Sequence, residues 1–358
     1  MDFSKRLLII LISITYGVQT CIAQNASNQE IMFKFIDIVE KNAYKSSLVN
    51  WDSIRVKSQN QVSNTIKMGD LRSIFEQILS QLKDSHSSIF YTEEASEGNE
   101  NEVLKQYATV TYEEVGHPFP DISGRMIEDK YAYLKVPGVL LEHKRYVQYI
   151  GEQIATLDKQ NPKAWIFDVA DNDGGTIWPM LWHMYDFIDQ DNIHSYIDRY
   201  GIEKKITRSM WDKANLDDQD MEFFELSGLS DESLTPINVA NKKAPLFILV
   251  DRKTASSGEL FVAAFKGQKN VTVIGQTTNG LTSVNETFPL NNHYLINLTT
   301  SVIKDRNGKI YKIGEGIKPD VDLQFLANSG IKEADQSTTE ENRIEMTVEY
   351  INQLGLLF

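Results

Sequence analysis

The sequence predicts a mixed α/β fold in which a largely parallel sheet follows a helical region. Between residues 31 and 82 the apolar side chains recur at helical spacing, with few strand signals. Further along, the short apolar runs 164–169 and 246–250 each lead into a polar turn and then into a helical pattern. This succession of strand, turn and helix is typical of parallel strands joined by crossover helices.

The composition is that of an ordinary globular protein. The chain has 358 residues, of which 41% are hydrophobic and 24% charged, and it can bury a sizeable core. Its formal net charge of −14 argues against a nucleic acid partner, because such proteins need a basic face that displaces counterions from phosphates. The same acidic balance disfavours attachment to an anionic membrane surface.

Residues 1–23 have the features of a cleaved secretory signal. Lys5 and Arg6 precede an apolar run over 7–18 that is short for a membrane span, and Ala23 offers a small residue for cleavage. We therefore expect an exported protein, periplasmic or extracellular, without a membrane span. The alternative is a lipoprotein acylated at Cys21, although the residues before Cys21 match that signal poorly. Cleavage after Ala23 removes the only cysteine, which excludes a thiol nucleophile.

The mature chain divides into a small helical part and a larger α/β part. We expect a helical domain over 24–92, a linker with entry strands over 93–130, a core over 131–330 and a closing helix over 331–358. Residues 192–240 are polar and irregular, and we assign them no role. Within the core, the pattern predicts strands over 131–136, 164–169, 246–250, 271–275 and 294–298, and helices over 146–157 and 180–188.

Hydroxyl side chains gather where the run 246–250 gives way to a helical pattern. The turn reads Asp251-Arg252-Lys253-Thr254-Ala255-Ser256-Ser257-Gly258-Glu259. A serine there can present its oxygen at a helix N-terminus, where unpaired N–H groups stabilise negative charge on an attacked carbonyl. The alternative is that these hydroxyls only cap the helix, which is a common role of serine and threonine at helix starts.

The run 164–169 ends in a second turn, Ala170-Asp171-Asn172-Asp173-Gly174-Gly175. Paired glycines allow the backbone to turn its N–H groups toward a substrate oxygen, as in an oxyanion hole. An ordinary tight turn is the alternative. Phosphate binding is disfavoured because neither of the glycine-rich nucleotide-binding motifs occurs in the chain.

Four short segments carry a family resemblance. They are Leu82-Lys83-Asp84-Ser85-His86-Ser87, Asp168-x-x-x-Asn172-x-Gly174-Gly175, Thr254-Ala255-Ser256-Ser257-Gly258-Glu259 and Gly314-x-Gly316-Ile317-x-Pro319-Asp320. In this order they resemble the tail-specific, or C-terminal processing, peptidase family, which includes the tricorn proteases. The resemblance implies a crotonase-like (ClpP/crotonase) core with an N-terminal helical bundle. It also implies a serine endopeptidase with Ser256 as nucleophile, and with N–H groups of Ser257 and of Gly174 or Gly175 as the oxyanion hole.

The same resemblance indicates which residue is the general base. Relatives of the Ser/Lys type carry a lysine in a Gly-Lys-Gly-Thr segment, whereas this chain has Leu281, which cannot accept a proton, in Asn279-Gly280-Leu281-Thr282. The tricorn-like branch uses a histidine with a serine beside it, which implies His86 as base and Ser85 as its neighbour. Histidine suits proton transfer near neutral pH because its ordinary pKa is about 6.5. Glu315 is the implied orienting acid, and Asp84 is expected to be a solvated charge at a helix end.

The segment 87–130 is too short for the PDZ domain that many relatives carry. We therefore expect a peptidase that acts on peptides or unfolded proteins without a dedicated tail reader. The alternative is a non-catalytic protein that binds an apolar ligand or peptide, because the family also contains retinoid-binding repeats. An acyl-CoA enzyme on the same core is disfavoured by the export signal. The remaining histidines show no ligand spacing, so we expect neither metal nor cofactor. The sequence leaves oligomerisation open.

Overall fold

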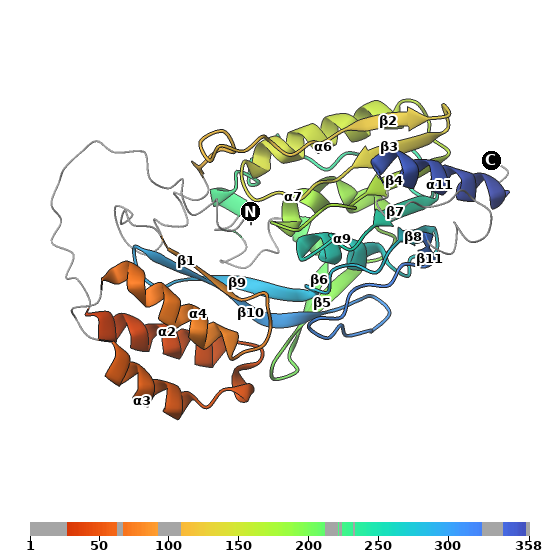
Figure 1. Ribbon diagram of the computed structural model, residues 1–358. Coiled ribbons are helices and arrows are strands. Elements are labelled where there is room, and N and C mark those ends of the chain that lie inside the picture. Colours follow the sequence, from red (N-terminus) through yellow and green to blue (C-terminus); the bar gives the residue numbers. More distant parts are fainter. Residues whose placement is uncertain are drawn as a thin grey trace. The chain divides into compact units, whose positions relative to one another are not determined.

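The computed structural model describes residues 27–62, 67–91, 109–211, 221, 224–231, 233–323 and 339–355. They form two compact units, and Figure 1 colours them along the chain. The first unit takes the described residues up to 119 together with 197–203 and 283–302, and the second takes the rest. The predicted signal peptide, its cleavage site and Cys21 lie outside the described residues. Within the described ranges, no helix is long and apolar enough to cross a membrane.

The first unit contains the helices α2 (Asn28–Asn42), α3 (Trp51–Gln61) and α4 (Leu71–Ser80), with short 3-10 turns at Ser46–Leu48 and Met68–Asp70. Helix α2 begins with a capping box. The Ser27 N–H donates to the Glu30 carboxylate (2.6 Å), and the Glu30 N–H donates to the Ser27 hydroxyl (3.3 Å). The rings of Phe35 on α2 and Phe75 on α4 stack with centroids 4.3 Å apart. The prediction of N-terminal helices is confirmed.

Antiparallel strands pack against these helices. They are β1 (Ser88–Tyr91), β9 (Ser283–Pro289) and β10 (Tyr294–Lys304), and β10 pairs with both of the others. Ile89, Ile296 and Leu298 share one buried cluster with the helices. The strand predicted over 294–298 is therefore present, but it pairs with antiparallel neighbours rather than with the parallel sheet. The apolar pattern of a strand does not specify its partner, because a half-buried face suits either kind of pairing.

Two further strands, β5 (Asn192–Asp198) and β6 (Glu203–Thr207), belong to the same sheet, whose order is β1-β10-β5-β6. The description of 192–240 as irregular is thus wrong for its first part. At the turn between these strands, the Asp198 carboxylate accepts the N–H groups of Tyr200 and Ile202, both at 2.8 Å. Strand β6 is mostly exposed, so its polar composition hid it from a pattern based on apolar residues.

The sheet of the second unit has the strand order β11-β8-β7-β4-β3-β2. Neighbouring strands are parallel, except that β2 runs antiparallel to β3. The central strands β4 and β7 are buried at every residue, which explains their unbroken apolar runs. The strands are β2 (Gly124–Ile127), β3 (Tyr131–Lys135), β4 (Ala164–Asp168), β7 (Leu246–Val250), β8 (Val271–Gly275) and β11 (Val321–Asp322).

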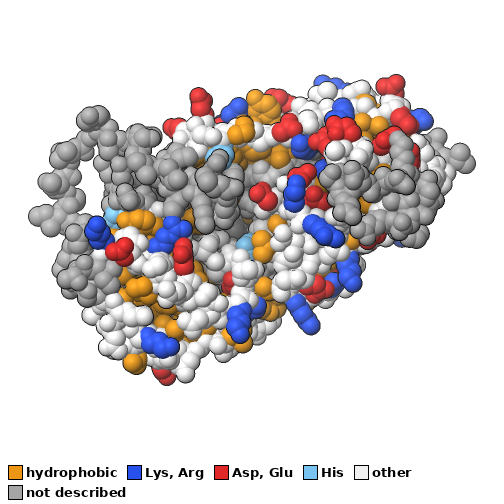
Figure 2. Space-filling view, viewed as in Figure 1, with side chains coloured by type: hydrophobic (Ala, Val, Ile, Leu, Met, Phe, Trp, Pro, Cys, Tyr) orange, Lys and Arg blue, Asp and Glu red, His pale blue; other side chains and the backbone are white. Residues whose placement is uncertain are grey.

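Helices accompany this sheet and complete the predicted mixed α/β fold (Figure 1). They are α6 (His143–Asp158), α7 (Ile177–Leu181) followed by a 3-10 helix (Trp182–Phe187), α9 (Ser257–Phe265) and α11 (Glu340–Gln353). A further 3-10 turn spans Arg208–Trp211. On the face seen in Figure 2, acidic and basic side chains are interspersed among apolar and neutral ones.

The order of the parallel strands decides where the two predicted turns lie. Strands β4 and β7 are neighbours, with Asp168 paired to Leu249 at their carboxyl ends. The glycine turn (170–175) follows β4, and the serine turn (251–256) follows β7. The carboxyl ends of adjacent parallel strands share one edge of the sheet, which is where ligand sites of open α/β sheets form. The two turns therefore emerge side by side.

Candidate active site

Ser256 has a backbone conformation that side chains rarely adopt. It lies at the N-cap position of α9 with φ 51° and ψ −119°. A non-glycine residue in such a region costs about 1–3 kcal/mol, and such residues are concentrated at functional sites. Ser256 is half-buried, whereas Ser257, at the first position of the helix, is buried. The strain and the partial exposure distinguish Ser256 from an ordinary capping serine.

Thr254 fixes the serine turn through hydrogen bonds of its side chain. This residue is fully buried, and its hydroxyl donates to the Val169 carbonyl at the end of β4 (2.9 Å). The same hydroxyl accepts the N–H of Asp251 (3.0 Å), whose carboxylate accepts the N–H of Thr254 (3.0 Å). The threonine two residues before the strained serine therefore fixes the turn to the neighbouring strand.

The glycine turn lies directly against Ser256. A Cβ placed on Gly174 would lie 2.7 Å from the Cβ of Ser256, closer than real Cβ contacts, and Gly174 has a φ of +113°. Two hydrogen bonds hold the turns together: the Ala255 N–H donates to the Asn172 carbonyl (2.9 Å), and the Ser257 hydroxyl donates to the Gly175 carbonyl. Glycine is therefore required at 174 both by conformation and by space.

Asn172 decides which N–H groups of the glycine turn are available. Its buried amide nitrogen donates to the Val136 carbonyl (2.9 Å), and its amide oxygen accepts the N–H of Gly174 (3.0 Å). Within the described ranges, no acceptor pairs with the backbone N–H of Gly175 or of Ser257. Of the two glycines predicted for the oxyanion hole, Gly175 is the one whose N–H is uncommitted.

Glu259 is a functional candidate that the sequence reasoning missed. Its fully buried carboxylate accepts the N–H of Ser256 (3.2 Å), the N–H of Gly280 (2.9 Å) and the hydroxyl of Thr278. Burial raises its pKa to about 7, although these hydrogen bonds favour the ionised form. The sequence signal was the spacing Ser-x-x-Glu at a helix start, which is the pattern of a capping box.

His86 lies in the first unit, in a short segment of unusual backbone. Lys83 and Ser85 both have positive φ, at 54° and 53°. Between them, the Asp84 carboxylate accepts the N–H of His86 (3.2 Å) and both the N–H and the hydroxyl of Ser87 (2.9 and 2.7 Å). Asp84 is only 3% exposed, so its description as a solvated charge is wrong. The carboxylate is buried because it satisfies the turn's own donors.

The ring of His86 is positioned by a serine distant in sequence. Its Nδ1 lies 2.8 Å from the Ser283 hydroxyl, and Asn285 donates to the His86 carbonyl (2.9 Å). Burial lowers the pKa of His86, and the nearby Asp84 carboxylate opposes that shift. Ser283 is buried, whereas the predicted neighbour Ser85 is exposed. No local sequence signal indicated Ser283, because the contact spans 197 positions of the chain.

Glu315 lies in the second unit, beside a lysine. Its carboxylate forms an ion pair with Lys309 (2.8 Å) and accepts the N–H of Lys312 (3.2 Å), and the Lys309 hydrogen bond lowers its pKa. The flanking glycines pack closely on the segment after β8: Gly314 donates to the Gly280 carbonyl (3.0 Å), and a Cβ on Gly316 would lie 2.2 Å from the Thr278 carbonyl oxygen. The assignment of Glu315 as the orienting acid stays a prediction.

The strained serine, the adjoining glycine turn and the parallel strands that carry them lie within one sequence match. Residues 130–323, more than half of the chain, match the sequence pattern of peptidase family S41. The chain belongs to this family. Membership in peptidase family S41 makes the protein a serine-type peptidase, and it confirms the resemblance to the C-terminal processing peptidases.

Individual relatives of this S41 peptidase are distant. It is 23% identical over 303 residues to the nisin-resistance protein of Lactococcus lactis subsp. lactis, covering 84% of this chain and 86% of the relative. A lipoprotein from Streptococcus agalactiae has a TM-score of 0.65 at 24% identity, over 87% of this chain and 98% of that one. The photosystem II D1 C-terminal processing protease has a TM-score of 0.55 at 13% identity, over 84% and 94%. These structures share the fold of the S41 peptidase.

Proposed function

We propose that the protein is an exported endopeptidase of the tricorn-like type, in which Ser256 is the nucleophile and His86 the general base. The observation that carries the proposal is the strained Ser256 at the start of α9, packed against Gly174. A capping serine needs no such conformation, whereas a nucleophile gains from a hydroxyl raised at a helix N-terminus. Ser256 and His86 belong to different units, and their pairing is part of the proposal.

The proposed reaction follows ordinary serine chemistry. His86 takes the proton of the Ser256 hydroxyl as its oxygen attacks the peptide carbonyl, and the carbonyl oxygen becomes an oxyanion. We assign the uncommitted N–H groups of Gly175 and Ser257 as its hydrogen-bond donors. Collapse of this intermediate breaks the C–N bond, and His86 returns the proton to the leaving amine. Water then hydrolyses the acyl-serine by the same steps.

Ser283 and Glu315 are alternative candidates for orienting His86. The Ser283 hydroxyl contacts the ring at Nδ1, and we propose Nε2 as the site of proton transfer. Glu315 is paired with Lys309 and is retained as the acid implied by the family resemblance. Ser85 is retained for the same reason. A neutral hydroxyl orients the ring but stabilises an imidazolium less than a carboxylate does, so Ser283 implies a weaker base.

We propose peptides and unfolded proteins as the substrates. The segment 87–130 gives no room for a tail-reading PDZ domain. One relative is named a nisin-resistance protein, so nisin is included among the substrates to be tested. The proposal of export rests on residues 1–23, and a similar structure is that of a lipoprotein, which fits export or attachment through Cys21.

The test is hydrolysis of casein and of nisin by the purified chain from residue 24 onward, at about pH 5 to 9. Ser256→Ala and His86→Ala are expected to lose activity by about 10³-fold or more while remaining folded. The matched controls Ser209→Ala and His117→Ala replace residues outside the site. A fluorophosphonate probe should label the wild type and not Ser256→Ala. Equal activity in all variants, or none in the wild type with no labelling, would contradict the proposal and favour a binding protein for an apolar ligand.

A further inference from the structure

Arg343 on helix α11 contacts two carboxylates, that of Asp168 just before the glycine turn and that of Asp171 within it. Its side chain is only 5% exposed, and its Nη2 lies 3.1 Å from the Asp171 carboxylate and 3.7 Å from that of Asp168. Asp168 is the last residue of β4, and Asp171 is the residue before Asn172. A guanidinium from the end of the chain thus contacts the segment that shapes the surroundings of Ser256.

Asp168 gives Arg343 a role in stability. This carboxylate is 1% exposed, accepts the Tyr133 hydroxyl (2.9 Å) and accepts the N–H of Ala170 (2.9 Å). Burial raises the pKa of Asp168 to about 6, and the Arg343 charge opposes that shift. Removing Arg343 alone would leave a buried carboxylate without its cation, which is strongly destabilising in proteins.

Asp171 gives Arg343 a second and different role. Asp171 has a φ of 63°, and its N–H donates to the Asp251 carboxylate in the serine turn (3.1 Å). Its own carboxylate accepts Lys253, also in the serine turn (2.5 Å), and Arg343. Asp171 therefore joins the glycine turn to the serine turn, and Arg343 restrains it from a third element.

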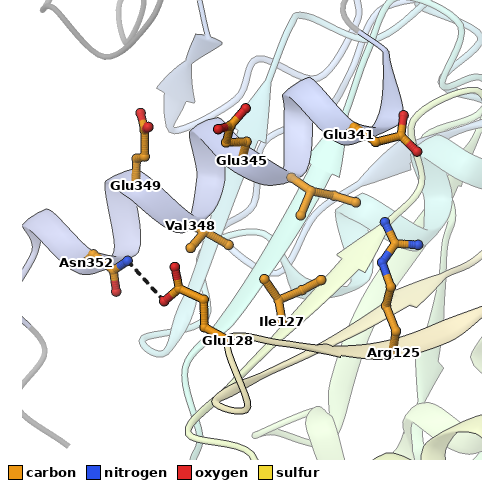
Figure 3. A pocket seen from close by; sticks show the side chains of 9 residues that line it. Arg125, Ile127, Glu128, Glu341, Glu345, Val348, Glu349 and Asn352 are labelled. Carbon is orange, nitrogen blue, oxygen red and sulfur yellow. Dashed lines mark hydrogen bonds between the residues drawn. The ribbon is translucent and has the colours of Figure 1, made fainter.

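Helix α11 is itself firmly attached to the sheet, so it can serve as a support. Ile344, Val348 and Ile351 pack in one buried cluster with residues of β3, β4 and β7. Figure 3 shows Val348 facing Ile127 of β2, while Glu345 and Glu349 point away from the strand. At the ends of the helix, Asn352 accepts the Tyr131 hydroxyl (2.6 Å) and Glu340 pairs with Lys135 (3.2 Å). The pocket in Figure 3, between β2 and α11, contains none of the turn residues.

We infer that Arg343 is a positioning residue that holds the glycine turn beside Ser256 through Asp171. The inference rests on the proposed function, because it assigns Arg343 an effect on turnover at that site. A mispositioned turn shifts an oxyanion donor, and small misplacements of such groups reduce turnover strongly. Arg343 contacts the carboxylate of Asp171, and it acts by fixing that residue.

The test separates this role from the neutralisation of Asp168. Arg343→Met alone is expected to be unstable, so the informative variant is Arg343→Met combined with Asp168→Asn, which removes both buried charges. We expect it to fold and to lose about 10- to 100-fold in kcat with KM changed by less than about threefold. Asp171→Asn should reproduce this loss. Two control variants should retain wild-type kcat. One is Asp168→Asn alone. The other is Arg125→Met, which replaces a guanidinium on β2 that pairs with Glu340 of α11.

Amide hydrogen exchange over residues 169–176 gives a readout that does not depend on substrate. Exchange should be faster in Arg343→Met/Asp168→Asn and in Asp171→Asn than in the wild type, and unchanged in Arg125→Met. Wild-type kcat and exchange in the double variant would overturn the inference and leave Arg343 only the role of neutralising Asp168. If exchange changes as expected but the wild type neither hydrolyses peptides nor reacts with a fluorophosphonate, the proposed function fails while the support of the turn by Arg343 stands.

Discussion

The carboxylate of Glu259 accepts the backbone N–H of Ser256, three residues before it on the chain (3.2 Å). The same carboxylate also accepts the N–H of Gly280 and the hydroxyl of Thr278, so all three of these partners are donors to it. A protonated carboxyl would bring its own hydrogen into this set of donors and displace one of them. The backbone of the candidate nucleophile is therefore held by a carboxylate whose hydrogen bonds favour the ionised form, while burial opposes ionisation.

The first prediction concerns the pH dependence of activity. Since burial raises the pKa of Glu259 to about 7, protonation should loosen the serine turn, and kcat/KM should fall as pH drops through about 7. The pKa of His86 is lowered, so its loss of base function lies further on the acid side. Glu259→Gln offers one oxygen instead of two. Its kcat/KM should be lower at every pH and should show no fall as pH drops through about 7. A pH–rate profile with that fall intact in Glu259→Gln would contradict the assignment.

The second prediction concerns the free energy of unfolding, which should change with pH in the opposite direction to activity. The folded-state pKa of Glu259 lies above its unfolded value of 4.5, so between these values the folded state binds more protons. The free energy of unfolding should therefore decrease as pH rises from 4.5 to 7, by on the order of 3 kcal/mol from this group. Urea unfolding at several pH values should show this slope in the wild type and a flatter curve in Glu259→Gln. Matching slopes in the two proteins would show that Glu259 does not titrate in this range.

The third prediction concerns the contact between the two turns. Gly174→Ala would place a Cβ 2.7 Å from that of Ser256 at a φ of +113°, so we expect at least about a 100-fold loss of kcat. Gly308→Ala is the matched control, because Gly308 also has a positive φ, +85°, but no atom lies within 4 Å of its added Cβ. Both variants should lose about 1–3 kcal/mol of stability from backbone strain. Comparable activity in the two variants would mean that the close approach at Gly174 has no part in catalysis.

The fourth prediction separates the two candidates for orienting His86. Ser283→Ala removes the hydroxyl 2.8 Å from Nδ1 and should lower kcat by about fivefold to tenfold, the equivalent of one hydrogen bond of about 1 kcal/mol. Glu315→Gln should have a smaller effect, because its carboxylate is occupied by Lys309. Steady-state kinetics of the two variants on one peptide substrate measures the difference. A larger loss in Glu315→Gln would reverse the order and restore the acid implied by the family resemblance.

Much of the α/β unit could be predicted because its signals are local. The buried strands β4 and β7 appear as unbroken apolar runs, and the turns after them carry the glycines and the hydroxyls. Since β4 and β7 are adjacent parallel strands, those turns meet at one edge of the sheet. Ser256 and the glycine turn thus followed from residue types, their order and a family resemblance.

The tertiary structure alone decided the contacts that surround these residues. Ser283 meets His86 across 197 positions, Arg343 meets Asp171 across 172, and Asp84 is buried because it satisfies its own turn. Strand β6 was hidden because its own residues are polar and mostly exposed. Periodicity and turn chemistry are properties of neighbouring residues, so the sequence by itself determined most elements of the α/β unit and its two turns, and the family resemblance added the candidate nucleophile. Partners distant in the chain depend on how packed elements bring side chains together, and only the folded chain specifies that.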